Sequence, residues 1–197
     1  MSGGPLIAAP LRIEAALICT AARGARVRKT GMGPGRARDA ARSLAAEAGG
    51  ALLVLGFCGG LDAKSVPGEV IVAEEVYAAS DEGHDPAERV SCANAQALVA
   101  VLAGRGVKVR SGEIVCVSKL ALGERRRELH EGGAIAVDME SVWLAAGAAG
   151  RPFAVVRVVL DSPSHELLRP RAAAGAIRAA RALRRVAGAL QEWTPED

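Results

Sequence analysis

The end of one apolar segment combines residue types that could act as a general acid. Residues 155–160 are apolar except for Arg157, and Asp161 follows them directly. Burial at a strand end raises the pKa of a carboxyl, so that Asp161 could hold a proton at neutral pH and donate it to a substrate. Arg157 and Asp161 are four residues apart and therefore share one face of a strand. An Arg157–Asp161 ion pair that only fixes the strand end is the alternative, and a nearby arginine opposes the pKa rise.

A second group of polar residues lies in the segment 136–141, which reads Ala-Val-Asp-Met-Glu-Ser. A short apolar strand is expected to lead into Asp138 and Glu140, with a helix beyond them. Carboxylates near a helix N-terminus are stabilised by the helix dipole, and this role is the favoured explanation for Asp138. Glu140 is a candidate for sugar binding, because a carboxylate can accept two hydroxyl protons while the thioether of Met139 packs against the sugar.

Two glycine-rich segments, 31–35 and 56–61, each follow a predicted strand and are expected to form turns. Glycine lets the backbone approach a ligand, and a helix N-terminus presents free N–H groups to an anion. Gly33 is therefore a candidate for binding phosphate. The first segment lacks the spacing of a dinucleotide-binding motif, and a turn without a ligand explains it equally well. Two such turns beside one sheet favour a cleft for a small polar ligand.

The elements that must position these residues alternate between strands and helices. We expect strands at 5–10, 25–30, 51–55, 69–77, 112–117, 134–137 and 152–160, and helices at 11–20, 37–48, 93–103, 123–130, 140–149 and 170–191. The helix 123–130 is charged and expected to be exposed, as is a loop at 80–91. The alternation predicts an α/β fold with helices on both faces of the sheet and ligands beyond the carboxyl ends of its strands. The length favours one domain, 1–197.

The composition argues against several classes of function. The net charge is only +3 and aromatic residues make up 3%, so a nucleic-acid partner is not expected. Four cysteines and three histidines do not cluster in the sequence, which favours reduced thiols over a metal site. Neither a secretory leader nor an apolar stretch of about 20 residues is present, so we expect a cytoplasmic protein.

The C-terminal helix is unusually basic. Six arginines and no acidic residue lie between 169 and 185. An apolar stripe is expected at Ile177, Ala180, Leu183, Ala187 and Leu190. An ordinary amphipathic helix with a solvated basic face is one interpretation, and transient contact with an anionic membrane is the other.

Taken together, the segments Gly-Phe-Cys-Gly-Gly-Leu, Val-Asp-Met-Glu-Ser and Arg-Val-Val-Leu-Asp resemble, in order and spacing, the purine nucleoside phosphorylase and methylthioadenosine/S-adenosylhomocysteine nucleosidase superfamily. The resemblance spans residues 7–189. It implies a three-layer α/β/α fold with a central mixed, largely parallel sheet. It also implies cleavage of the N-glycosidic bond of a purine nucleoside by phosphate or water, without metal or organic cofactor, in a homo-oligomer, with a dimer favoured.

Within that superfamily the chain is most similar to the hopanoid-associated nucleoside phosphorylases. The Asp-Met-Glu-Ser segment and the element Leu-Leu-Arg-Pro at 167–170 carry this similarity. It implies release of adenine from adenosylhopane.

The resemblance also implies roles for individual residues around the purine and the ribose. Asp161 matches the acid that protonates N7 of the leaving base. Glu140 matches the carboxylate that binds the ribose hydroxyls, and Met139 the residue that packs on the sugar. Gly59 and Gly60 match the glycine pair beside the base and ribose. The segment 118–122, where base-stacking residues are expected, does not align.

The resemblance leaves the nucleophile open. Glu14 matches the carboxylate that orients water in the hydrolases, whereas Arg12 resembles the arginine that holds phosphate in the phosphorylases. The chain departs from the superfamily at Phe57 and Leu160, where serine is common, which puts phosphate binding and base contacts in doubt. Phe57 and Arg157 are further candidates for substrate contact.

Two other classes of function are compatible with the same residues. A non-catalytic nucleotide- or lipid-binding module could use this fold, although retention of Asp161 and Glu140 argues against it. A dinucleotide-dependent oxidoreductase is disfavoured by the imperfect glycine motif.

Overall fold

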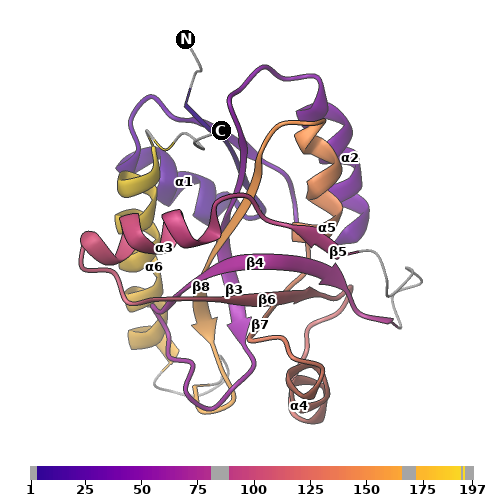
Figure 1. The fold of residues 1–197 in the computed structure, drawn as a ribbon. Coiled ribbons are helices and arrows are strands. Elements are labelled where there is room, and N and C mark those ends of the chain that lie inside the picture. Colours follow the sequence, from indigo (N-terminus) through magenta and orange to yellow (C-terminus); the bar gives the residue numbers. More distant parts are fainter. Residues whose placement is uncertain (1–3, 81–88, 166–171, 192, 194–197) are drawn as a thin grey trace.

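The computed structural model describes residues 4–80, 89–165, 172–191 and 193 of the chain (Figure 1). The strands are β1 (Leu6–Ala9), β2 (Arg26–Lys29), β3 (Leu52–Gly60), β4 (Val70–Ala78), β5 (Arg89–Ser91), β6 (Val109–Cys116), β7 (Ala136–Asp138) and β8 (Phe153–Asp161). The helices are α1 (Arg12–Ala21), α2 (Pro34–Ala45), α3 (Ala95–Gly104), α4 (Glu124–Glu131), α5 (Ser141–Leu144), the 3₁₀ helix η2 (Ala145–Ala148) and α6 (Ala172–Leu190).

The strands form one mixed sheet in the order β2-β1-β3-β7-β6-β4-β5. β8 lies off this path and pairs in parallel with β3 and antiparallel with β4. Because β7 and β6 also link β3 to β4, the pairing closes on itself, and β3 and β8 cross the direction of β4 and β6 (Figure 1). The pairs β1–β2, β1–β3, β4–β6 and β6–β7 are parallel, and β3–β7 and β4–β5 are antiparallel.

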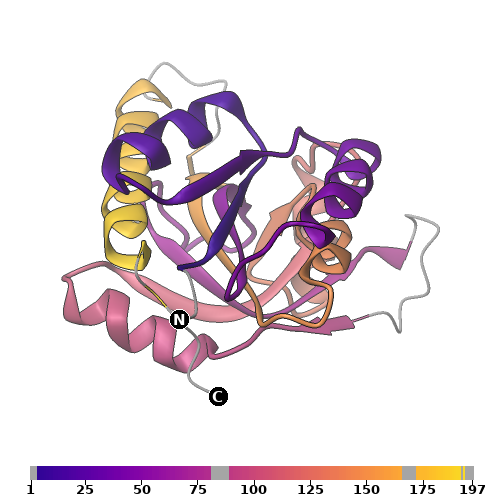
Figure 2. The same ribbon diagram turned by 90° about the horizontal axis from the view of Figure 1, so that it is seen from above.

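Helices cover both faces of this sheet, which confirms the predicted fold class (Figure 2). The core on one face includes Leu98 of α3, Ile18 of α1 and Leu183 of α6. The core on the other face includes Leu44 of α2 and Trp143 of α5. β8 supplies alternate residues to both cores, which explains why its sequence is apolar almost throughout rather than alternating.

The glycine-rich segment 56–61 is not a turn, and that prediction was wrong. β3 continues through it to Gly60, and Gly59 and Gly60 pair with β7. The glycines instead allow close packing on the strand. A Cβ atom at Gly56 would lie 2.6 Å from Oε1 of Glu14, and one at Gly60 would overlap the Cβ of Ser65. Close approach of other segments, which local sequence does not reveal, is the physical reason for these glycines.

Three other expectations are corrected. The helix predicted at 140–149 is a single turn, α5, followed by η2. Residues 89–91 of the predicted loop form β5, which pairs with β4, and residues 81–88 lie outside the described part of the chain. Ile177 is 52% exposed rather than part of the buried stripe. That stripe is Ala179, Leu183, Val186, Ala187 and Leu190.

The cysteines differ sharply in exposure. Cys19 is exposed, whereas Cys58 and Cys116 are buried. Burial raises the pKa of the Cys58 and Cys116 thiols, and it raises the pKa of Cys92 to about 12. Among the described residues, no group of three or more His, Cys, Asp or Glu side chains could hold a metal ion. None of the described helices has the length and apolar character to cross a bilayer.

Candidate active site

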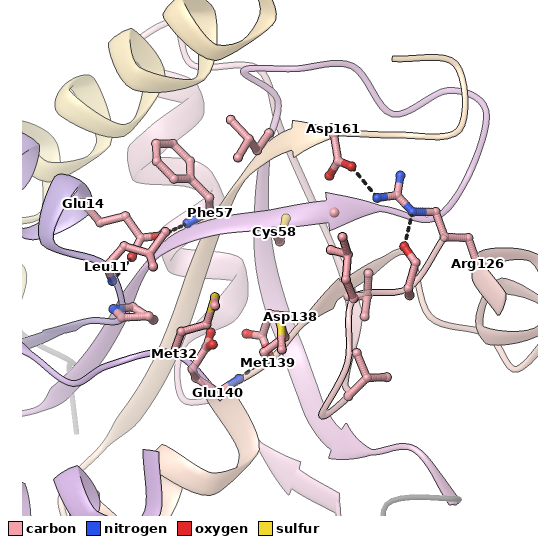
Figure 3. A pocket seen from close by; sticks show the side chains of 17 residues that line it. Leu11, Glu14, Met32, Phe57, Cys58, Arg126, Asp138, Met139, Glu140 and Asp161 are labelled. Atoms are coloured by element: carbon pink, nitrogen blue, oxygen red, sulfur yellow. Dashed lines mark hydrogen bonds and ion pairs between the residues drawn. The ribbon is translucent and has the colours of Figure 1, made fainter. Parts of the chain in front are cut away.

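A cleft opens where β3, β7 and β8 end, next to the start of α1 and the loop that follows β6 (Figure 3). Six residues predicted to form the site line it: Glu14, Phe57, Gly59, Met139, Glu140 and Asp161. Asp161 and Glu140 lie on opposite sides of this cleft in Figure 3. The walls between them are largely apolar, with Leu11, Met32 and Leu160 among the lining side chains. The cleft therefore offers four acidic side chains, those of Glu14, Asp138, Glu140 and Asp161, in a mainly apolar setting.

Four other predicted residues do not line the cleft. Arg12 is exposed on α1. Gly33 precedes α2, and its N–H donates a 3.0 Å hydrogen bond to Oε1 of Glu140. Gly60 packs against Ser65, and Arg157 is fully buried behind the cleft. The N–H of Gly33, which was a candidate for binding phosphate, thus donates to the carboxylate of Glu140 in this structure.

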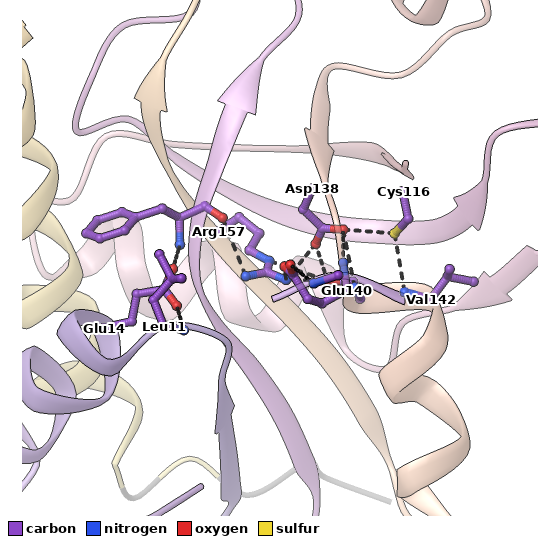
Figure 4. A network of polar contacts seen from close by, with 10 residues as sticks. Leu11, Glu14, Cys116, Asp138, Glu140, Val142 and Arg157 are labelled. Carbon is purple, nitrogen blue, oxygen red and sulfur yellow. Dashed lines mark hydrogen bonds and ion pairs between the residues drawn. The ribbon is translucent and has the colours of Figure 1, made fainter. Parts of the chain in front are cut away.

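Arg157 is the centre of a buried network of charges (Figure 4). Its Nη2 lies 2.7 Å from Oδ2 of Asp138 and 3.5 Å from Oε2 of Glu140. The same nitrogen donates a 3.0 Å hydrogen bond to Oγ of Ser141. The sequence left open an ion pair between Arg157 and Asp161. Both residues are described in the structure, and they do not form this pair. Arg157 instead fixes the segment that carries Asp138 and Glu140.

Asp138 and Glu140 experience this arginine differently. Burial opposes ionisation of Asp138, but Arg157 together with hydrogen bonds from Cys116 and Ser141 outweighs it and lowers the Asp138 pKa. For Glu140, burial dominates over the attraction of Arg157 and raises the pKa to about 7. Asp138 is therefore the permanent partner of Arg157, while Glu140 can exchange a proton near neutrality.

Glu14 joins the start of α1 to β3. Its Oε2 accepts a 2.6 Å hydrogen bond from the N–H of Leu11, and its Oε1 accepts one of the same length from the N–H of Phe57. Burial raises the Glu14 pKa against the opposing charge of Arg157. The missing side chain of Gly56 leaves room for this carboxylate. A glutamate in the first turn of a helix thus reaches a strand 43 residues away in sequence.

Asp161 has a partner that the sequence did not predict. Nη2 of Arg126 on α4 lies 2.5 Å from Oδ2 of Asp161, and both side chains are almost fully buried. The charged helix 123–130 was expected to be exposed. Arg125 and Arg127 indeed lie toward solvent, but Arg126 is only 3% exposed. Three consecutive arginines carry no local signal that singles out the buried one.

A family model described as the phosphorylase superfamily matches residues 15–188. The solved structure of 5′-methylthioadenosine/S-adenosylhomocysteine nucleosidase from Campylobacter jejuni superposes with a TM-score of 0.79 at 13% identity, covering 98% of this chain and 100% of that one. The Neisseria meningitidis nucleosidase in complex with methylthio-immucillin-A gives 0.77 at 16% identity, with coverage of 98% and 100%. Futalosine hydrolase of Helicobacter pylori gives 0.73 at 17% identity, with coverage of 97% and 95%. No curated protein matches at the level of sequence.

At these identities the superpositions establish the fold. The family model establishes membership, because it spans most of the chain, from within α1 to near the end of α6. The strand-end carboxylates that first indicated this superfamily lie inside the matched region and face one cleft. The chain belongs to the phosphorylase superfamily.

Proposed function

We propose that this protein cleaves the N-glycosidic bond of a purine nucleoside, with Asp161 as the acid that protonates the leaving base. The observation that carries the proposal is the placement of Asp161 and Glu140 in one cleft, with Met139 beside Glu140. A nucleoside has two polar ends, a base and a ribose diol, joined by the bond to be broken. Two carboxylates on opposite sides of an apolar cleft suit such a ligand.

The charges around the cleft favour the chemistry of this bond. Its cleavage places positive charge on the ribose and negative charge on the base. Three buried carboxylates, Glu14, Asp138 and Glu140, surround the single buried arginine of the network, Arg157. Asp138 balances the charge of Arg157, so an ionised Glu14 or Glu140 adds net negative charge that favours a cationic ribose, and a proton from Asp161 neutralises the departing base. A positioned acid of this kind contributes on the order of 10²–10⁴-fold to the rate.

Water is the nucleophile that the geometry supports better. Glu14 lines the cleft, and each of its oxygens keeps acceptor capacity beyond its one backbone hydrogen bond. Arg12, the candidate for phosphate, lies outside the cleft. Among the described residues that line the cleft, Arg126 is the only cation, and it is paired with Asp161. Phosphate would therefore meet carboxylates rather than arginines.

The cleft mouth supports a substrate with an apolar 5′ substituent. Met32 and Leu120 line the cleft and are 50% and 62% exposed. Large apolar side chains at a cleft mouth lose contact with water when an apolar group covers them, which favours its binding. Adenosylhopane, the substrate implied by the sequence resemblance, carries such a group.

Contact with an anionic membrane would suit a lipid-linked substrate. Arg178, Arg181 and Arg185 of α6 line a surface hollow together with Lys108. Glu69 lines the same hollow and pairs with Lys108, so the three arginines carry the attraction for anionic lipid headgroups, at about 1 kcal/mol for each arginine near such a surface. Flotation with phosphatidylserine vesicles at low salt tests this contact, and a protein that stays at the bottom of the gradient excludes it.

One assay tests the function. The protein is incubated with adenosine, methylthioadenosine or adenosylhopane, with and without phosphate, and free adenine is followed. Release without phosphate supports hydrolysis, and a strict requirement for phosphate replaces water by phosphate as the nucleophile. Tight binding of all three compounds without any release supports the alternative, a non-catalytic binding module.

A further inference from the structure

We infer that Arg126 is a positioning residue for the acid: it fixes one oxygen of Asp161, leaves the other to the leaving base, and stabilises the carboxylate that remains after proton transfer. This inference rests on the proposed function and deepens it. It concerns a residue on α4 that is 35 residues away from Asp161 in the sequence.

The contact between the two side chains is directional. Nη2 of Arg126 reaches Oδ2 of Asp161 at 2.5 Å. Among the described residues, Arg126 is the only one that donates a hydrogen bond to this carboxyl. A protonated carboxyl can therefore accept from Arg126 through Oδ2 while its Oδ1–H donates to a base nitrogen. Gly59 makes room for the pair, because a Cβ atom there would lie 3.2 Å from Nη2 of Arg126 and 3.4 Å from Oδ1 of Asp161.

Arg126 also ties the acid to the wall of the cleft. Its Nε donates a 2.9 Å hydrogen bond to the carbonyl oxygen of Ala121. Ala121 and Leu120 both line the cleft, in the loop between β6 and α4. One guanidinium therefore sets the position of the acid relative to the loop that faces it. A planar group with several fixed donors suits this double contact.

The environment of Arg126 is poorly explained by stability alone. The residue is 3% exposed, and its Nη1 has no hydrogen-bond partner in the described part of the chain. Burying a cation with an unsatisfied N–H is unfavourable, and exposed neighbours on the same helix show that α4 can place arginines in solvent.

The proton moves from Oδ1 of Asp161 to the purine nitrogen, and the electron pair of the C–N bond goes to the base. Water adds to the ribose carbon and loses its own proton to the Glu14 carboxylate. Asp161 becomes a carboxylate beside Arg126, and the charge of the guanidinium stabilises it. A leaving group that departs readily as an anion needs neither the proton nor the arginine.

This difference gives the test. The wild type, Arg126→Met, Arg126→Lys and the exposed control Arg127→Met are assayed with adenosine and with 4-nitrophenyl riboside, whose leaving group needs no protonation. Arg126→Met should lower kcat/KM for adenosine by about 10²-fold, the scale of a misplaced catalytic group, and leave the nitrophenyl reaction nearly unchanged. Arg126→Lys should recover part of the adenosine rate, and Arg127→Met should match the wild type on both substrates.

Retained nitrophenyl cleavage shows that Arg126→Met is folded. Equal losses on both substrates, or no loss on either, overturn the role of Arg126 and leave the proposed function intact. A wild type that releases no adenine from adenosine, methylthioadenosine or adenosylhopane overturns the proposed function, and the role of Arg126 with it.

Discussion

Three carboxylates near the cleft have the same chemistry in isolation and different partners in the fold. Asp138 is held by Arg157, Glu140 lies farther from the same arginine, and Asp161 faces a different arginine on another helix. Environment rather than residue type therefore divides the work among them. Asp138 orients its segment, while Glu140 and Asp161 present oxygens to the cleft.

The first prediction concerns the acid. Asp161→Asn should retain the fold and lose most adenine release, by on the order of 10²–10⁴-fold, because an amide cannot donate the required proton. Steady-state release of adenine measures the effect, and Asp39→Asn, at an exposed pair on α2, is the matched control. Undiminished turnover by Asp161→Asn would reject the assignment.

At the scale of single residues, the sequence predicted which carboxylates face the cleft but not which arginines pair with them. Asp161 and Glu140 were recognisable because each follows an apolar strand. The partner of Asp161 was not, because Arg126 is 35 residues away and one of three adjacent arginines. Arg157 was predicted to contact the substrate, yet it is fully buried behind the cleft. The alternation of side chains along a strand shows which face of the sheet a residue is on, but it does not show how deeply the residue is buried.

Among the elements, β3 has the greatest influence on the site. It carries Phe57 and Gly59 into the cleft and pairs with β8 up to Asp161, with a register shift after Cys58. Glycines within it let Glu14, Arg157 and Ser65 pack against the backbone. The same glycines suggested a turn from sequence, because local rules cannot distinguish a bend from a close approach.

A glycine exchange tests this explanation. Gly56→Ala should destabilise the protein by about 1–3 kcal/mol, because the new methyl group would lie 2.6 Å from Oε1 of Glu14 and 2.8 Å from Nη1 of Arg157. Gly35→Ala is the control: it lies in α2 with no atom near a new Cβ, and should stabilise by about 0.5–1 kcal/mol. Urea unfolding measures both changes. Equal stability of the two variants would show that the close approach at Gly56 is unimportant.

The molecule as a whole places its cleft at the strand ends of a sheet that carries an apolar core on each face. The α/β class, the covering of both faces by helices and the strand-end location of the site all followed from hydrophobic patterning. The pairing of β4 with β8 could not be predicted in this way, because antiparallel pairing between strands distant in the sequence does not change the hydrophobic pattern of either strand. The helix predicted at 140–149 was too long, because the segment forms only the single turn α5 followed by the 3₁₀ helix η2.

Burial of Glu140 should make global stability depend on pH. Its pKa is raised from 4.5 to about 7, so the stabilisation present when it is protonated is lost as the pH rises through about 7. Glu140→Gln stays neutral, and should gain up to about 3 kcal/mol in unfolding free energy relative to wild type between pH 5 and pH 8. Denaturant titrations at both pH values measure this. Glu124→Gln, at an exposed position on α4, should show no such gain, and a pH-independent difference for Glu140→Gln would contradict the raised pKa.

The four thiols differ in burial, and we expect only one of them, that of Cys19, to react readily with a labelling reagent. A maleimide at neutral pH should attach once, to Cys19, because the thiolate is the reactive form, Cys58 and Cys116 are buried, and the pKa values of Cys58, Cys92 and Cys116 are all raised. Mass spectrometry of intact protein counts the adducts, and rapid double labelling would contradict the expectation. A fluorophore on α1 then reports on the helix that carries Glu14. The slow alkylation of Cys58 and Cys116 would report the rate of transient opening of β3, which carries Cys58 at the cleft, and of β6, which ends at Cys116.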